Sequence, residues 1–148
     1  MRIALGADHA GVSLKDQLKR QLEERGASWQ DFGTTSADAV DYPDFAGRVA
    51  GAVAAGTFDR GILVCGSGIG MAIAANKVPG IRAAAVGDEA AADLSRSHND
   101  INVLALGARA TAPELAARLV SIFLDTPFSG GRHQRRLDKV AALDQALR

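Results

Sequence analysis

Five short apolar segments recur along the chain, and amphipathic segments separate them. Three of the apolar segments, at residues 61–65, 82–86 and 102–106, show no alternation of polar and apolar positions. Strands of this kind are typical of a parallel sheet that is buried on both faces. The pattern predicts strands at 2–7, 28–33, 60–66, 80–88 and 101–107.

The segments between these strands have the periodicity of helices. Leu14, Leu18 and Leu22 recur every four residues, and Gly26 follows as a helix stop. Alternating strands and helices with right-handed crossovers predict a doubly wound α/β/α sandwich, whose sites form at the carboxyl ends of the strands. Helices are predicted at 14–26, 41–56, 69–77, 89–99 and 112–125, with a last one over 132–147.

The last predicted helix lies beyond the completed sandwich. In GGRHQRRLDKVAALDQALR (130–148), a basic first turn is followed by apolar positions that include Leu137, Val140 and Leu143. A helix that follows a finished sandwich often packs on another subunit. We therefore expect a homo-oligomer in which this helix contacts a partner.

Length, charge and cysteine content restrict the protein class. The chain has 148 residues, and we expect residues 1–148 to form one domain with its own core. Lys plus Arg and Asp plus Glu both number 17, so the zero net charge argues against a general nucleic-acid-binding surface. One cysteine cannot form an intrachain disulfide, and no apolar run reaches the ~20 residues that span a bilayer. These features favour a cytoplasmic protein without a signal peptide or membrane contact.

The single cysteine stands in an unusual segment, LVCGSGIGMAIAANK (63–77). Cys65 ends a predicted central strand, and the glycine-rich turn after it offers backbone N–H groups that stabilise a thiolate or an oxyanion. The spacing fits neither a dinucleotide fingerprint, nor a Walker A loop, nor a nucleophile elbow centred on Ser67. Two interpretations stay open, a buried hydrophobic cysteine and a base for proton transfer beside a carbonyl.

Other polar clusters are candidates for the same site. Asp8 and His9 follow the first strand and share the edge of Cys65, unless Asp8 is only a helix cap. His98 and Asn99 precede a strand, so they lie at the opposite edge. They belong either to a site shared between subunits or to a surface loop.

Basic residues form a further candidate site, for an anion. Arg132 and Arg136 are one helical turn apart, and Arg109 follows a strand. Forked guanidiniums suit a phosphate dianion, although a solvated basic turn is the simpler alternative. Positive charge opposes the dipole at a helix start, which favours a bound anion there. The three histidines lack ligand-like spacing, so no metal site is predicted.

Taken together, these motifs resemble one family, the type B ribose-5-phosphate isomerases and their sugar-phosphate isomerase relatives. The similar stretches are GADHAG, DYPDFA, GILVCGSGIGMAIAANKVPGIRAA, LSRSHNDINVLALGAR and GGRHQRR, in family order over nearly the whole chain. The resemblance implies a Rossmann-like fold and a metal-free, cofactor-free aldose–ketose isomerase of the non-oxidative pentose phosphate pathway. It also implies dimers or tetramers with active sites at the subunit interface.

The resemblance implies a role for each matching residue. Cys65 corresponds to the base that moves a proton between C2 and C1 through a cis-enediolate, and His98 to the residue that opens the sugar ring. Met71 stands where a branch without this cysteine has glutamate. Ser67, Gly66, Gly68, Ile69 and Gly70 correspond to the oxyanion-binding turn, Asp8, Tyr42 and Asn99 to sugar contacts, and His9, Arg109, Arg132 and Arg136 to phosphate contacts, with His133 a weaker candidate.

Two other function classes compete with this one. A cysteine hydrolase or acyltransferase would use Cys65 and His98 for nucleophilic catalysis with the same turn as oxyanion hole. A non-catalytic sugar-phosphate sensor would need the fold alone, but 148 residues leave no room for an appended DNA-binding domain.

Overall fold

Five parallel strands form one sheet, as the apolar pattern predicted. The computed structural model describes residues 1–147. The central strands β1, β3 and β5 are almost entirely buried, whereas β4 at the edge pairs only with β5. The strand predicted at 80–88 is therefore shorter than expected. The strands are β1 (Arg2–Ala7), β2 (Ser28–Asp31), β3 (Arg60–Cys65), β4 (Ala83–Ala85) and β5 (Val103–Gly107), in the order β2-β1-β3-β5-β4.

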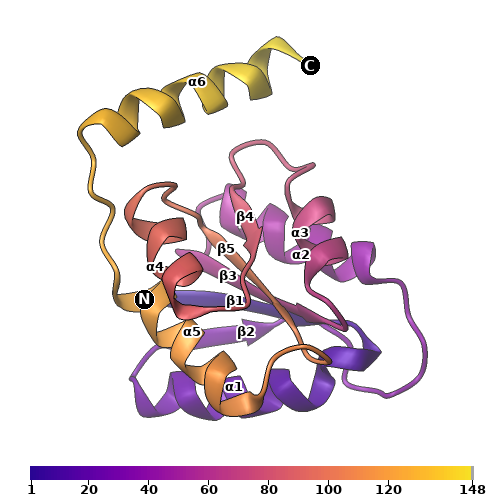
Figure 1. Cartoon of the computed structure of the whole chain (residues 1–148). Coiled ribbons are helices and arrows are strands. Elements are labelled where there is room, and N and C mark those ends of the chain that lie inside the picture. The colour runs from indigo at the N-terminus through magenta and orange to yellow at the C-terminus, as the bar shows by residue number, and fades with distance from the viewer. Residues whose placement is uncertain (148) are drawn as a thin grey trace.

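Helices cover both faces of the sheet and confirm the three-layer α/β/α sandwich (Figure 1). On one face, the leucine stripe predicted for the first helix packs with Ile3 and Leu5 of β1 and with Phe123. On the other face, Val49 and Met71 pack against the opposite side of the strands. The first face carries α1 (Val12–Glu24), α4 (Glu89–Ser97) and α5 (Pro113–Asp125), and the second carries α2 (Tyr42–Ala54) and α3 (Ile69–Ala75); a short 3-10 helix, η1 (His9–Gly11), follows β1.

A buried ion pair anchors the loop that follows β2. Lys15 of α1 is fully buried, and its ammonium donates to Asp31 Oδ1 at 3.0 Å and to the backbone oxygen of Thr34 at 2.5 Å. The N–H of Gly33 donates to the same carboxylate at 2.8 Å. Loss of solvent raises the pKa of Asp31, but the hydrogen bonds from Lys15, Lys19 and the Gly33 N–H together outweigh this effect, so the net pKa is lowered. The pair thus holds the loop that leads into α2.

The last helix, α6 (Arg132–Ala146), stands apart from the sandwich at the end of an extended segment (Figure 1). The ring of His133 stacks on His98 with 4.1 Å between centroids. Farther along α6, Asp144 Oδ2 accepts a hydrogen bond of 3.1 Å from the N–H of Gly80. The predicted helix is confirmed, and these contacts fix its direction.

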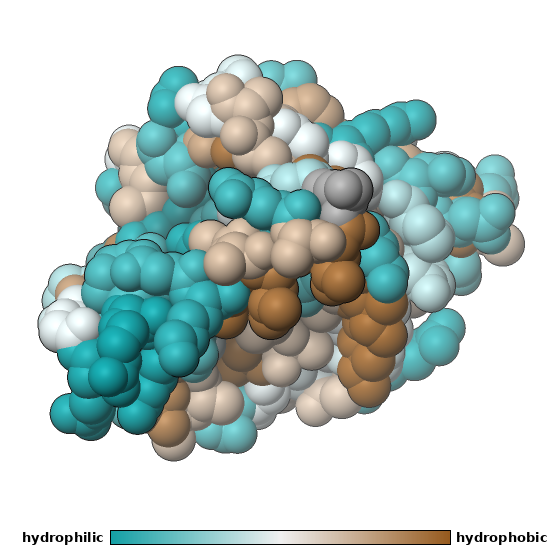
Figure 2. All heavy atoms as spheres, turned by 90° about the horizontal axis from the view of Figure 1, so that it is seen from above, coloured by the Kyte–Doolittle hydropathy of each residue, from teal (hydrophilic) through white to brown (hydrophobic). Residues whose placement is uncertain are grey.

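Several apolar side chains stay uncovered in the single chain. Figure 2, seen from the side of α6, shows hydrophobic residues in the middle of this face and strongly hydrophilic ones at one end. Val140 and Leu143 of α6 are 47% and 59% exposed, and Ile69 and Ile73 of α3 are 58% and 57% exposed. No helix within the described part of the chain is long and apolar enough to cross a bilayer.

Candidate active site

A cleft of about 400 Å³ opens at the carboxyl ends of the central strands. The register pairs Ala7 with Val64 and Cys65 with Gly107, so these strands end side by side. Residues that follow these strands therefore meet at one place, where the sites of a doubly wound sheet are expected. The cleft is lined by seven predicted site residues, Asp8, Tyr42, Cys65, Gly66, Ser67, Gly70 and Arg109, and by Ala110, which no sequence signal had indicated.

The thiol of Cys65 is buried in the apolar core and also reaches the cleft. It is 5% exposed and packs with the apolar cluster under α2 and α3. Its Sγ also accepts a hydrogen bond from the backbone N–H of Gly68 at 3.1 Å. The cysteine is therefore a core residue whose sulfur faces a donor at the cleft.

The turn after Cys65 offers further backbone donors. The N–H of Ile69 donates to Ser67 Oγ at 3.2 Å. The N–H groups of Ser67 and Gly70 have no acceptor within residues 1–147. Preorganised N–H groups beside a base suit the negative oxygen of an enediolate.

At two glycines of this turn, side chains pack directly against the backbone. A methyl group at Gly66 would approach Arg109 Nη1 to 2.9 Å, and one at Gly70 would approach the Tyr42 ring to 2.7 Å. A side chain at either position would push its neighbour away. The glycines therefore let the guanidinium and the phenol ring lie against the turn that carries Cys65.

Asp8 and His9 follow β1 and are held by backbone groups. Asp8 is 6% exposed, and its Oδ1 accepts the N–H of Ala10 at 3.0 Å, so it caps η1 while it also lines the cleft. His9 Nδ1 accepts the N–H of Val40 at 3.2 Å. A nitrogen that accepts carries no proton, which places the proton of the neutral ring on Nε2 as a donor.

His98 lies apart from the cleft within one chain, as the sequence predicted. It follows α4 and precedes β5, whereas Cys65 ends β3, so the two residues belong to opposite edges of a parallel sheet. Asn99 lines a different cavity, together with Leu137 and Val140 of α6. The predicted site is thus divided into two groups.

The second group is strongly basic. Arg132 and Arg136 lie in the first turns of α6, beside the His98–His133 stack. Loss of solvent lowers the pKa of His133, and the charges of His98, Arg132 and Arg136 lower it further. None of Arg109, Arg132 and Arg136 forms an ion pair with a carboxylate of residues 1–147. The two guanidiniums of α6 suit a phosphate group, and so does that of Arg109 in the Cys65 cleft.

Potential metal ligands are few in the cleft. Within the described residues, His, Cys, Asp and Glu do not gather in a group of three that could hold a metal ion. The cleft itself offers one thiol and one carboxylate, fewer than the three protein ligands of a typical catalytic zinc site.

Comparisons with known proteins agree on one family. The ribose/galactose isomerase family model matches residues 3–140. Ribose-5-phosphate isomerase B of Escherichia coli (strain K12) is 48% identical over 144 residues, 97% of each chain. D-erythrulose-4-phosphate isomerase of Pectobacterium atrosepticum is 41% identical over 95% of this chain and 93% of its own. The solved structure of Clostridium thermocellum ribose-5-phosphate isomerase B matches with a TM-score of 0.98, 47% identity and 100% coverage of both chains.

Proposed function

Since the chain belongs to the ribose/galactose isomerase family, we propose that it interconverts D-ribose 5-phosphate and D-ribulose 5-phosphate. The chain is an isomerase, which sets aside the hydrolase and sensor alternatives. The observation that carries the proposed chemistry is the hydrogen bond from Gly68 to Cys65 Sγ at a cleft with unpaired N–H groups. The proposed reaction belongs to the non-oxidative pentose phosphate pathway, and we propose that the chain carries it out as a single domain.

Cys65 is the proposed base. Its thiolate takes the proton from C2 of the open-chain aldose and returns it to C1 of the cis-enediolate. The N–H groups of Ser67 and Gly70 would hold the oxygen that becomes negative, because they have no acceptor in residues 1–147. Met71 is fully buried and carries no acid, so Cys65 is the base available in this turn. This route needs neither a metal ion nor a cofactor.

The sugar contacts follow from the lining of the cleft. The Asp8 carboxylate has one oxygen committed to Ala10, which leaves the other for a sugar hydroxyl. The Tyr42 hydroxyl, on a ring packed over Gly70, supplies a second polar contact. The Arg109 guanidinium lies over Gly66 and would bind phosphate at the same cleft.

The remaining groups reach the cleft only if a second copy of the chain supplies them. His98, Asn99, Arg132 and Arg136 all lie away from Cys65 in the single chain. A two-fold axis places equivalent surfaces of two copies against each other. Each copy would then contribute these four residues to the cleft of its partner. The uncovered apolar side chains of α3 and α6 provide the surface for such a dimer, alone or within a tetramer.

His98 of the partner subunit is proposed to open the ring. Ribose 5-phosphate is mainly a furanose, and C2 becomes acidic only after the ring oxygen is protonated and C1 becomes an aldehyde. An imidazole exchanges such a proton near neutral pH. The stack with His133 fixes the plane of the His98 ring, at 4.1 Å between centroids.

Replacing His98 by asparagine should slow the conversion of cyclic substrates selectively. We expect kcat/KM for ribose 5-phosphate to fall on the order of 100-fold, the scale of general acid–base catalysis. Erythrose 4-phosphate carries its phosphate on O4 and cannot form a furanose, so its conversion should fall far less. Equal losses on both aldoses would remove His98 from ring opening.

A second substrate is favoured by the relative from Pectobacterium, which is named for D-erythrulose 4-phosphate. One assay panel decides the preference: ribose 5-phosphate, erythrose 4-phosphate, allose 6-phosphate, galactose 6-phosphate, and free ribose and allose, with ketose formation measured. The proposal expects the highest kcat/KM for ribose 5-phosphate. A clear preference for any other sugar would contradict it.

A further inference from the structure

The turn that carries His98 and Asn99 is flanked by two residues without a part in the proposed chemistry, Arg96 and Asp100. The turn joins α4 to β5. Asp100 has a φ of 45°, the one positive φ outside glycine among residues 1–147. Aspartate tolerates this left-handed region better than most residues, yet it needs surroundings that hold it there.

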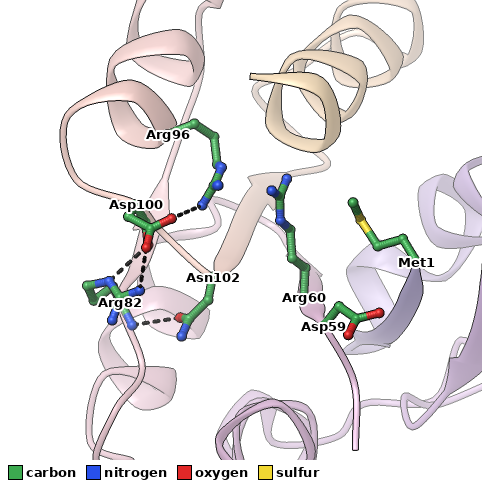
Figure 3. Close-up of a pocket in the computed structure, with 7 residues that line it drawn as sticks. All are labelled: Met1, Asp59, Arg60, Arg82, Arg96, Asp100 and Asn102. Carbon is green, nitrogen blue, oxygen red and sulfur yellow. Dashed lines mark hydrogen bonds and ion pairs between the residues drawn. The ribbon is translucent and has the colours of Figure 1, made fainter. Parts of the chain in front are cut away.

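Two arginines engage both oxygens of the Asp100 carboxylate. Arg96 Nη1 donates to Oδ1 at 2.7 Å, and Arg82 Nη2 lies 3.1 Å from Oδ2. Arg82 Nε also donates to the backbone oxygen of Asp100 at 2.9 Å. Figure 3 shows the carboxylate between the two guanidiniums. We call Arg82, Arg96 and Asp100 the Asp100 clamp.

The clamp is tied to neighbouring elements on both sides. Arg96 is 6% exposed and donates to the backbone oxygens of Ile101 at 2.6 Å and of Thr126 at 3.3 Å, the latter in the segment that leads to α6. The N–H of Arg82 donates to Asn102 Oδ1 at 2.8 Å. The His98 turn is thereby fixed to the beginnings of β4 and β5 and to the approach of α6.

Charge makes the carboxylate essential to this arrangement. Arg60 faces the same cavity, about 560 Å³ in volume, as Arg82 and Arg96. Loss of solvent and then the charge of Arg96 lower the pKa of Arg60 to about 10. Without the Asp100 carboxylate, Arg82 and Arg96 would lose the anion that they share, and Asp59, which pairs with Arg2, would be the one carboxylate left in the lining beside three guanidiniums. Their repulsion would displace the turn.

We propose that the Asp100 clamp positions the His98 imidazole for ring opening in the partner's cleft. This inference rests on the proposed function of His98. Arg82, Arg96 and Asp100 are positioning residues, because they contact the turn and belong to the amino edge of the sheet, away from the Cys65 cleft. Their effect should therefore be confined to the step that His98 performs.

The test is Asp100→Asn, which keeps the size of the side chain and its tolerance of a positive φ but removes the charge. We expect kcat/KM for ribose 5-phosphate to fall on the order of ten- to a hundredfold, as small displacements of catalytic groups do. Because erythrose 4-phosphate needs no ring opening, kcat/KM for this substrate should fall less than about threefold. Asp59→Asn is the matched control, because it removes a carboxylate that lines the same cavity (Figure 3) but pairs with Arg2 and does not touch the turn.

His98→Asn, assayed in parallel, separates the two proposals. If His98→Asn affects both aldoses equally, the proposed function of His98 fails. The clamp proposal is overturned if His98→Asn lowers kcat/KM selectively for ribose 5-phosphate but Asp100→Asn lowers kcat/KM equally for both aldoses, or for neither. Thermal unfolding of each variant verifies that the fold persists.

Ribulose 5-phosphate supplies a second readout that does not depend on four-carbon turnover. It is acyclic because its O5 carries the phosphate, and deuterium uptake at C1 needs the base but no ring closure. The ratio of C1 deuterium uptake to net conversion should rise on the order of tenfold in Asp100→Asn. An unchanged ratio in Asp100→Asn, with a raised ratio in His98→Asn, would contradict the clamp.

Discussion

Replacing Cys65 by alanine is expected to lower turnover of ribose 5-phosphate at least ~100-fold, the usual contribution of a general base. The sulfur is the atom that accepts the Gly68 N–H, and Met71 beside it has no titratable group. Nothing else in the turn can therefore take the proton from C2. Steady-state kinetics with ribose 5-phosphate measures the loss.

The matched variant Cys65→Ser separates packing from proton transfer. Serine nearly keeps the volume of the buried side chain, but its hydroxyl is a very weak base near neutral pH. Both variants should fold, because Cys65 is only one small member of the cluster under α2 and α3. Turnover near the wild-type value in either variant would remove Cys65 from the role of base.

Replacing Arg132 and Arg136 together by glutamine should raise KM for ribose 5-phosphate by at least ~100-fold, because each charged hydrogen bond contributes about 1.5–3 kcal/mol. Conversion of free ribose or allose should hardly change, since neither carries a phosphate. Arg135→Gln is the control, because it removes the same charge between the two positions but on another face of α6. Equal changes in KM for phosphorylated and free sugars would show that this pair does not bind phosphate.

Burial explains why most of the fold could be predicted from the sequence. The central strands β3 and β5 are covered by helices on both faces, so their sequences are uniformly apolar. The edge strand β4 was predicted too long, because pairing on only one side leaves three residues in the ladder. The segment at 80–88 is apolar enough for a strand, but the length of that strand depends on how much of it pairs with β5.

The part of the candidate site that lies at the ends of the parallel strands could be predicted from the sequence. Cys65 and Asp8 end neighbouring parallel strands, so topology alone brings them to one cleft. The Asp100 clamp was not predictable, since Arg82 reaches Asp100 only through tertiary packing across 18 residues. The same limit applies to the stack of His98 on His133, which depends on the direction of α6.

The central claim is that each active site takes Cys65 from one chain and Arg132 and Arg136 from another. Co-production of Cys65→Ala with the Arg132→Gln, Arg136→Gln double variant tests it, with ribose 5-phosphate below KM. Each parent alone should retain about 1% of wild-type activity. A hybrid dimer contains one site with all groups intact, so random pairing should restore roughly a quarter of wild-type activity.

Cys65→Ala co-produced with Asp8→Asn is the control, because both residues line the same cleft and no hybrid site is then intact. That mixture should show no recovery. Recovery of activity only in the first mixture is the result that the account predicts. Activity no greater than the average of the two parents, with hybrid dimers demonstrated by mass spectrometry, would contradict a site shared between subunits.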